Sequence, residues 1–137
     1  MNLRKSILTV AVLLSAFFLI TSCSMSMKEG RAWLDTYKDP PALDVTGTWT
    51  CREFSVAQLT QVGREINGAF YGGGLISGVA SGNSIHLLIY DIDTVLYMAT
   101  LETADRSTMN GEYVGANGLL DTWAEGIRRP LSMVKLP

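Results

Sequence analysis

The sequence predicts an all-β fold: a small antiparallel up-and-down meander that closes into a barrel of about eight short strands. Short runs of alternating apolar and polar residues follow one another at a spacing of roughly ten residues. Residues that form turns, such as glycine, asparagine and aspartate, separate the runs. A leader helix at 1–22 and a tether at 23–46 precede the barrel domain, which we place at 47–137.

The start of the chain has the order of residues that is typical of an export signal. Arg4 and Lys5 supply a short positive segment, and the uncharged apolar run 7–20 follows it. That run suits the apolar region of a signal peptide and is shorter than the ~20 residues that a membrane-spanning helix needs. We therefore expect residues 1–22 to be a signal peptide and the protein to be exported.

The apolar run ends in the tetrapeptide Ile20-Thr21-Ser22-Cys23. It resembles the lipobox of bacterial lipoproteins, in which an aliphatic, a small or branched, and a small residue precede a cysteine. The resemblance implies cleavage before Cys23, lipidation of its sulfur, acylation (palmitate, for example) of the new N-terminus, and lasting anchorage to a membrane. In a host with two membranes, Ser24 implies the outer membrane, facing the periplasm. The alternatives are an ordinary secretory signal and an uncleaved anchor.

Cysteine usage depends on this interpretation. The chain contains only Cys23 and Cys51, so lipidation of Cys23 excludes an intrachain disulfide. Cys51 is then a lone thiol, either a small buried hydrophobe on a strand or a reactive group. His86 is the only histidine, which excludes a cysteine–histidine zinc cluster within one chain. We expect no metal and no cofactor apart from the covalent lipid.

Length and charge limit the number of domains and the kinds of partner that the chain can have. The chain after the signal peptide is long enough for one domain with one core. The formal net charge is −2 and becomes more negative when Arg4 and Lys5 leave with the signal peptide. Basic residues are scattered apart from Arg128-Arg129, so we expect no nucleic acid partner.

The tether contains one segment with helical spacing. Trp33 and Tyr37 recur as on one face of a helix, with charged residues between them, and the prolines at 40–41 end the pattern. We expect either a short amphipathic helix at 28–38 or a linker without regular structure. If the helix forms, its aromatic face lies on the domain or on the lipid surface.

We expect strands near 47–54, 57–62, 65–71, 75–80, 84–90, 94–102, 108–114 and 123–128, with a last one near 131–136. A weak repeat places Gly68, Gly78 and Gly111 inside three of these strands. Glycine inside a strand marks a bend or the close approach of another backbone, as in a small, tightly coiled sheet. The alternative is that Asn67-Gly68 and Asn110-Gly111 are two-residue hairpin turns.

The domain opens with a G-x-W element, Gly47-Thr48-Trp49, and Arg128-Arg129 stands near its end. Together with the meander and the glycine repeat, this arrangement resembles the calycin group, which includes lipocalins and avidins. The resemblance implies a lipocalin-like barrel in which Trp49 plugs the base and Arg128 or Arg129 packs across it, a cation–π contact worth ~1 kcal/mol. The polar set with which avidins hold biotin has no match here, so the resemblance implies no particular ligand.

The middle strands are apolar on both sides. In one of them Val95 and Tyr97 face one way, and Leu96 and Met98 face the other. A lone barrel in water keeps one side polar, so we expect the outer face of this hairpin to be covered. In order of preference, the cover is the aromatic segment of the tether, a second subunit or a partner protein.

The sequence offers no catalytic constellation. A Ser-His-Asp triad would have to use His86, which stands among aliphatic residues of a strand. Asp91 and Asp93 fit a tight turn better than an acid–base pair. The glycines at 72–74 lack the lysine that follows in a phosphate-binding loop. We therefore expect a protein that is not an enzyme.

Two hypotheses of function remain. The first is a barrel that binds a small apolar ligand in its interior. The candidate lining residues are aromatic or amphipathic: Phe54, Phe70, His86, Tyr90, Tyr97 and Tyr113. The second is a structural or interaction lipoprotein whose apolar sheet face docks an envelope protein or a second copy of the chain. A roomy interior favours ligand binding, whereas a filled interior with an apolar outer patch favours docking.

Overall fold

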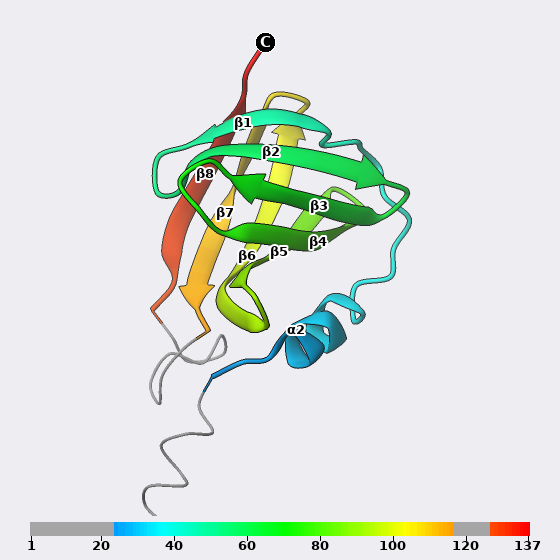
Figure 1. The fold of residues 1–137 in the computed structure, drawn as a ribbon. Coiled ribbons are helices and arrows are strands. Elements are labelled where there is room, and N and C mark those ends of the chain that lie inside the picture. Colours follow the sequence, from blue (N-terminus) through cyan, green and yellow to red (C-terminus); the bar gives the residue numbers. More distant parts are fainter. Residues whose placement is uncertain (1–23, 117–126) are drawn as a thin grey trace, which may run out of the picture.

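The computed structural model of the protein describes residues 24–116 and 127–137. The expected signal peptide at 1–22 and the expected lipidation site, Cys23, lie outside the described residues, as do residues 117–126. The described part contains one helix, α2 (Met27–Leu34), and eight strands (Figure 1). The strands are β1 (Gly47–Cys51), β2 (Ser55–Val62), β3 (Glu65–Phe70), β4 (Leu75–Ser81), β5 (Ser84–Asp91), β6 (Thr94–Asp105), β7 (Thr108–Gly115) and β8 (Arg129–Lys135).

These strands form one antiparallel sheet, in which each strand pairs with the next along the chain. β8 also pairs with β1, with Trp49 opposite Lys135 and Cys51 opposite Met133, so the sheet closes into a barrel. The predicted all-β up-and-down barrel is therefore confirmed. The strand expected near 131–136 is β8, whereas most of the one expected near 123–128 lies outside the described residues.

Side chains fill the interior of the barrel. Alternate residues of each strand point inward, and the inward set is apolar and buried. Leu59, Ile66 and Leu101, from three different strands, are each 0 % exposed. An eight-stranded barrel is narrow enough for such side chains to meet at its centre. This interior core consists of Val45, Trp49, Cys51, Ala57, Leu59, Ile66, Phe70, Ile76, Ala80, Ile85, Leu87, Ile89, Ala99, Leu101, Met109, Tyr113, Leu131 and Met133.

Three glycines let neighbouring strands approach closely. Gly68, Gly78 and Gly111 lie inside strands, and a Cβ on any of them would overlap a backbone carbonyl oxygen of a neighbouring strand. Their partners in the ladders are the buried leucines Leu59, Leu87 and Leu101. The three positions therefore exclude a side chain, as the tight coiling of a small barrel requires. The alternative of hairpin turns at Asn67-Gly68 and Asn110-Gly111 is wrong, because both pairs lie within continuous ladders.

A second apolar cluster lies on the outer face of β4 to β7, where α2 and its flanking residues cover the sheet. This outer cluster consists of Leu34, Val79, Leu88, Val95, Met98, Val114 and Ala116, with Met25, Met27, Trp33 and Tyr37 packed against it. The preferred cover, the aromatic segment of the tether, is thus the one found. The outward apolar residues of the middle strands are explained by burial under the chain's own N-terminal segment.

Local chemistry fixes the position of α2. The helix begins one residue earlier and ends four residues earlier than the expected 28–38. Ser26 caps it, since its hydroxyl accepts a hydrogen bond from the backbone N–H of Glu29 at 3.2 Å. Gly30 faces the sheet, and a Cβ there would lie 2.7 Å from Cδ1 of Leu88 and 3.0 Å from Cγ2 of Val95. The small residue therefore allows close packing of helix on sheet.

The register between β5 and β6 corrects two expectations. It shifts between Ile89 and Tyr90, so Ile89 pairs with Tyr97 and Tyr90 pairs with Val95. The extra residue, Leu96, is a bulge that places Val95 on the outer face instead of beside Tyr97. Directly paired residues share a face of the sheet, so Tyr90 also faces outward and does not line the interior.

Candidate functional site

A groove of about 460 Å³ lies on the outer face of the barrel, beside the helical segment. Trp33 and Tyr37 line it from that segment, and Met98, Thr100 and Val114 line it from β6 and β7. The other lining residues are Glu102, Asn110, Gly111, Glu112, Tyr113 and Arg128. Among the described residues, α2 covers only part of the apolar outer face, and the groove lies between its aromatic residues and β7.

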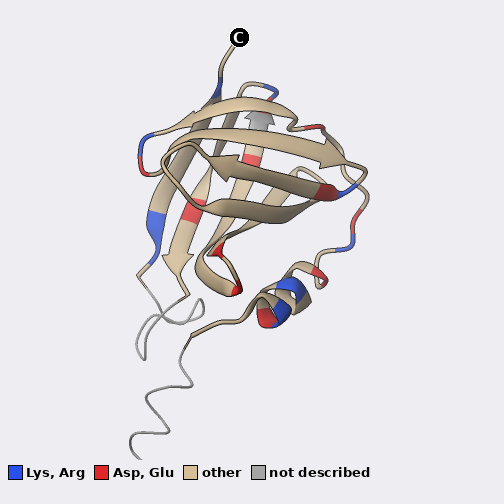
Figure 2. Cartoon of the chain, in the orientation of Figure 1, with Lys and Arg blue, Asp and Glu red and all other residues tan. Residues whose placement is uncertain are grey.

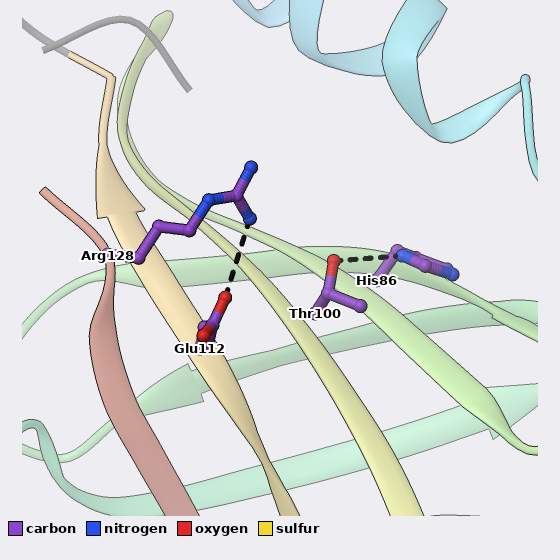
Figure 3. Close-up of polar contacts among 4 residues, drawn as sticks. All are labelled: His86, Thr100, Glu112 and Arg128. Carbon is purple, nitrogen blue, oxygen red and sulfur yellow. Dashed lines mark hydrogen bonds and ion pairs between the residues drawn. The ribbon is translucent and has the colours of Figure 1, made fainter. Parts of the chain in front are cut away.

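Two opposite charges stand at the rim of this groove. Arg128 Nη1 lies 3.5 Å from Glu112 Oε2, and about half of each side chain is exposed (Figure 3). An ion pair with this exposure contributes at most ~1 kcal/mol to stability. Elsewhere most charged residues lie on α2 and at turns (Figure 2). The groove thus combines aromatic and apolar side chains with polar ones, among them two carboxylates, Glu102 and Glu112, and one guanidinium, Arg128.

His86 lies on the outside of the barrel, under the helical segment. The ring of Tyr37 stacks on it, with 3.4 Å between centroids, and Trp33 meets it edge-on at 5.8 Å. Its Nδ1 lies 3.1 Å from Thr100 Oγ1 (Figure 3). The expectation that His86 lines the interior is wrong, because the alternation of β5 points the neighbouring residues inward and His86 outward. Burial lowers the pKa of His86 from 6.5 to about 4, so the ring is neutral near pH 7.

Four of the expected lining residues do meet inside the barrel. Phe54 lies 5.3 Å from Phe70, 5.2 Å from Tyr97 and 5.0 Å from Tyr113, measured between ring centroids. These rings gather at the end of the barrel that carries the β1–β2, β3–β4 and β5–β6 turns. They pack edge-on or tilted against one another, a favourable arrangement for aromatic pairs. The cluster therefore closes this end of the interior with protein side chains.

Trp49 closes the opposite end, where the calycin resemblance places a plug. It is 1 % exposed, and its Nε1–H donates a hydrogen bond to the Val45 carbonyl at 2.9 Å. The cation over its ring is Lys135, with Nζ 5.9 Å from the centroid. The expectation that Arg128 or Arg129 packs there is corrected: β8 begins at Arg129 and ends at Lys135, so the arginines stand ~20 Å away along the strand.

A larger cavity of about 770 Å³ opens beside Trp49. Its lining includes residues 41–46 and carboxylates that are already bound by their own turns. Asp44 accepts a hydrogen bond from the N–H of Thr46, and Asp105 accepts hydrogen bonds from the N–H and hydroxyl of Ser107. Hydrogen bonds from Thr46, its side chain first and then its N–H, lower the pKa of the Asp44 carboxyl group, and those from the N–H and hydroxyl of Ser107 lower the pKa of the Asp105 carboxyl group. Both aspartates therefore act as turn residues.

Cys51 belongs to the interior core and is 5 % exposed. Burial raises the pKa of its thiol, which disfavours the reactive thiolate. Of the two alternatives for this residue, the small buried hydrophobe fits its surroundings.

Residues 24–116 and 127–137 contain no group of three or more histidine, cysteine, aspartate or glutamate side chains that could hold a metal ion. No helix in the same residues is long and apolar enough to cross a membrane. The groove offers the aromatic rings of Trp33 and Tyr37, the thioether of Met98, polar side chains such as Asn110, and the Glu112–Arg128 ion pair.

The sequence alone did not point to this groove. Trp33 and Tyr37 were assigned to a tether, and the docking of a tether on a sheet depends on residues ~50 positions away along the chain. Two sequence signals bear on the groove: outward apolar residues such as Met98, which require a cover, and the helical spacing of Trp33 and Tyr37, whose aromatic face was one candidate cover.

The closed antiparallel barrel, with a buried tryptophan on its first strand, is compatible with a calycin-like fold. Comparison with protein-family models, curated proteins and solved structures finds no match to this chain.

Proposed function

We propose that this chain is a lipid-anchored interaction protein of the cell envelope, which docks an apolar segment of a partner protein in the groove beside α2. Export and acylation of Cys23 would hold it on a membrane, in the outer membrane facing the periplasm if the host has two. The observation that carries the docking proposal is the groove itself, with Trp33 and Tyr37 on one side and Met98 on the other.

The filled interior supports an outer site. Both ends of the barrel are closed, by Trp49 at one end and by the cluster around Phe54 at the other. Between them, core side chains such as Leu101 and Met109 are 0 % exposed. A ligand inside the barrel would have to displace this packing, at several kcal/mol for each large side chain. A partner in the groove need not displace these core side chains.

The composition of the groove supports a protein partner. Tryptophan, tyrosine, methionine and arginine are enriched where proteins bind one another, and aromatic residues and arginine dominate the binding energy. Trp33, Tyr37, Met98 and Arg128 supply all four types. The Glu112–Arg128 pair at the rim adds polar groups that could set the register of a docked segment.

The position of His86 supports binding rather than catalysis. It is the only histidine in the sequence, and Tyr37 and Trp33 cover its ring. A general base needs contact with its substrate and a pKa near the working pH. A buried imidazole with a pKa of about 4 meets neither requirement.

Thiol counting tests the anchor. The sequence has two cysteines, and we expect the protein purified from membranes to show one titratable thiol after denaturation, that of Cys51. Cys23→Ser should leave an uncleaved precursor that fails to partition into a detergent phase. Two free thiols in the mature protein, or normal partitioning of the variant, would refute lipidation.

Site-specific photo-cross-linking in intact cells tests the groove. A photoreactive residue at Asn110, inside the groove, should give a covalent protein adduct, whereas the same residue at Asn67 should not. Asn67 is a matched control, because it is exposed, precedes a mid-strand glycine and lies on β3, away from the groove. Trp33→Ser should abolish the Asn110 adduct. Equal labelling from both positions contradicts docking in the groove.

A small apolar molecule is the second candidate occupant, because about 460 Å³ lies within the size range of small-molecule sites. Native mass spectrometry of the lipidated protein, released from a mild detergent, distinguishes a small-molecule ligand from a protein partner. A bound mass of a few hundred daltons that Asn110→Trp removes and Asn67→Trp retains favours the small molecule.

A further inference from the structure

The chain enters the barrel beside the β5–β6 turn. The carbonyl of Met25 accepts a hydrogen bond from the N–H of Val95 at 3.0 Å, and the N–H of Met27 donates one to the carbonyl of Asp93 at 3.0 Å. Cys23 precedes Met25 by two residues, and a chain extends at most ~3.6 Å per residue. The proposed lipid on Cys23 is therefore separated from this turn by no more than two residues of chain, ~7 Å when fully extended.

The same end of the barrel exposes large apolar side chains on three connections. Ile92, in the β5–β6 turn, is 80 % exposed. Tyr71 and Leu75, around the β3–β4 turn, are 71 % and 45 % exposed, and Ile127, before β8, is 72 % exposed. In the described residues, the other exposed large apolar side chains, Val62, Val134 and Leu136, lie toward the opposite end. A group of such side chains on one surface marks contact with a partner or a membrane.

The backbone at Ile92 provides a second observation. Its φ is +52°, in the left-handed region that glycine and asparagine readily adopt and that is unfavourable for a β-branched residue. Asparagine or glycine would relieve this strain and make the turn more polar. The turn itself therefore does not require an isoleucine, and at 80 % exposure its side chain contributes little to the packing of the barrel.

Charges at this end are mixed. Asp91 and Asp93 flank Ile92, whereas Arg128 and Arg129 stand at the start of β8 (Figure 2). The surface therefore has no strong preference for anionic lipid, and apolar contact is what it offers. Such contact suits the boundary between headgroups and acyl chains, where isoleucine enters the acyl region and tyrosine keeps its hydroxyl in water.

We propose that the barrel end formed by Tyr71, Leu75, Ile92 and Ile127 rests on the lipid surface and inserts these side chains into its headgroup boundary. The inference depends on the proposed anchor at Cys23, which places the membrane at this end. It assigns the protein an orientation: the Trp49 end points away from the membrane, and the barrel stands on its β5–β6 turn (Figure 1).

A depth measurement tests the orientation. The lipidated full-length protein, with Cys51→Ala, is reconstituted in phosphatidylcholine vesicles carrying a nitroxide on the acyl chain. A fluorescent label that responds to polarity is attached at Ile92→Cys or, as the matched control, at Val62→Cys. Val62 is 75 % exposed and ends β2 at the opposite end of the barrel. We expect a blue-shifted emission and strong nitroxide quenching at residue 92, and a water-like emission without quenching at residue 62.

The remaining outcomes are distinct. A water-like label at residue 92 in a protein that floats with the vesicles overturns the proposed surface and leaves the anchor intact. Equal quenching at both positions overturns the orientation. A protein that does not float with the vesicles at all refutes the anchor, and the proposed surface falls with it.

Discussion

The ring of Tyr37 lies parallel to the imidazole of His86, with 3.4 Å between their centroids and 10° between their planes. The contact joins the segment after α2 to the middle of β5, 49 residues later in the chain. Trp33 closes a second side of the same imidazole. This stack holds α2 and its flanking residues on the barrel and forms one wall of the groove. The docking of that segment is therefore coupled to the protonation of His86.

The first prediction concerns pH. The pKa of His86 is about 4 in the folded protein and about 6.5 when unfolded, so the unfolded state binds more protons between these values. The free energy of unfolding should be highest above pH ~6.5 and should fall as the pH drops toward 4, by at most ~3 kcal/mol. Urea unfolding between pH 7 and 4.5 measures this loss. His86→Phe, which keeps a ring under Tyr37, should remove most of the dependence, and an unchanged slope in that variant would show that another group is responsible.

The second prediction concerns the helix contact at Gly30. A leucine there would collide with Leu88 and Val95, so Gly30→Leu should release α2 from the sheet at a cost of ~2–3 kcal/mol. Amide hydrogen exchange over residues 27–34 should accelerate strongly. Ala32→Leu is the control, because Ala32 is exposed on the same helix and its replacement should change stability by less than ~0.5 kcal/mol. Equal protection in the two variants contradicts the packing of Gly30.

The third prediction concerns the mid-strand glycines. Gly111→Ala would place a methyl group against the carbonyl oxygen of Thr100, so β6 and β7 would have to separate. We expect a loss of ~3 kcal/mol or more in the free energy of unfolding, measured by chemical denaturation. Gly72→Ala is the control, because its Cβ would meet only Ser55 at an ordinary 3.8 Å. Similar losses in the two variants would mean that backbone flexibility, not close approach, explains the repeat.

The fourth prediction separates the contribution of the buried Trp49 ring from that of the Lys135 charge above it. Trp49→Ala removes a buried plug and should cost ~3–5 kcal/mol. Lys135→Met keeps the aliphatic stem over the ring and removes the charge, so it should cost no more than ~1 kcal/mol. Thermal unfolding monitored by circular dichroism measures both. A larger loss for Lys135→Met than for Trp49→Ala would show that the cation, rather than the plug, stabilises this end.

Several features of the barrel could be predicted from the sequence because local chemistry dictates them. Turn residues at regular spacing set the strands, and the apolar alternation that puts Leu87 inside also puts Leu88 outside. The repeat around Gly68, Gly78 and Gly111 predicts close strand approach, which the ladders confirm. Even the need for a cover on the outer face followed from the apolar character of both sides of β5.

Other features depended on register, which local patterns do not encode. The bulge at Leu96 reversed the face of Val95 relative to Tyr97, because one extra residue reverses the side chains beyond it, whereas Tyr90 faces outward by the regular alternation of β5. The predicted cation over Trp49, Arg128 or Arg129, was wrong because the sequence does not give the register of β8. Only the pairing of β1 with β8 shows that Lys135 stands opposite Trp49.

The sequence by itself determined the fold class, the mid-strand glycines and the need for a cover on the sheet, because each follows from residues close together in the chain. The tertiary structure alone decided what the cover is and which residues form the groove. These depend on contacts between segments that are distant in sequence, and the geometry of such contacts is set by strand register and helix docking rather than by local composition.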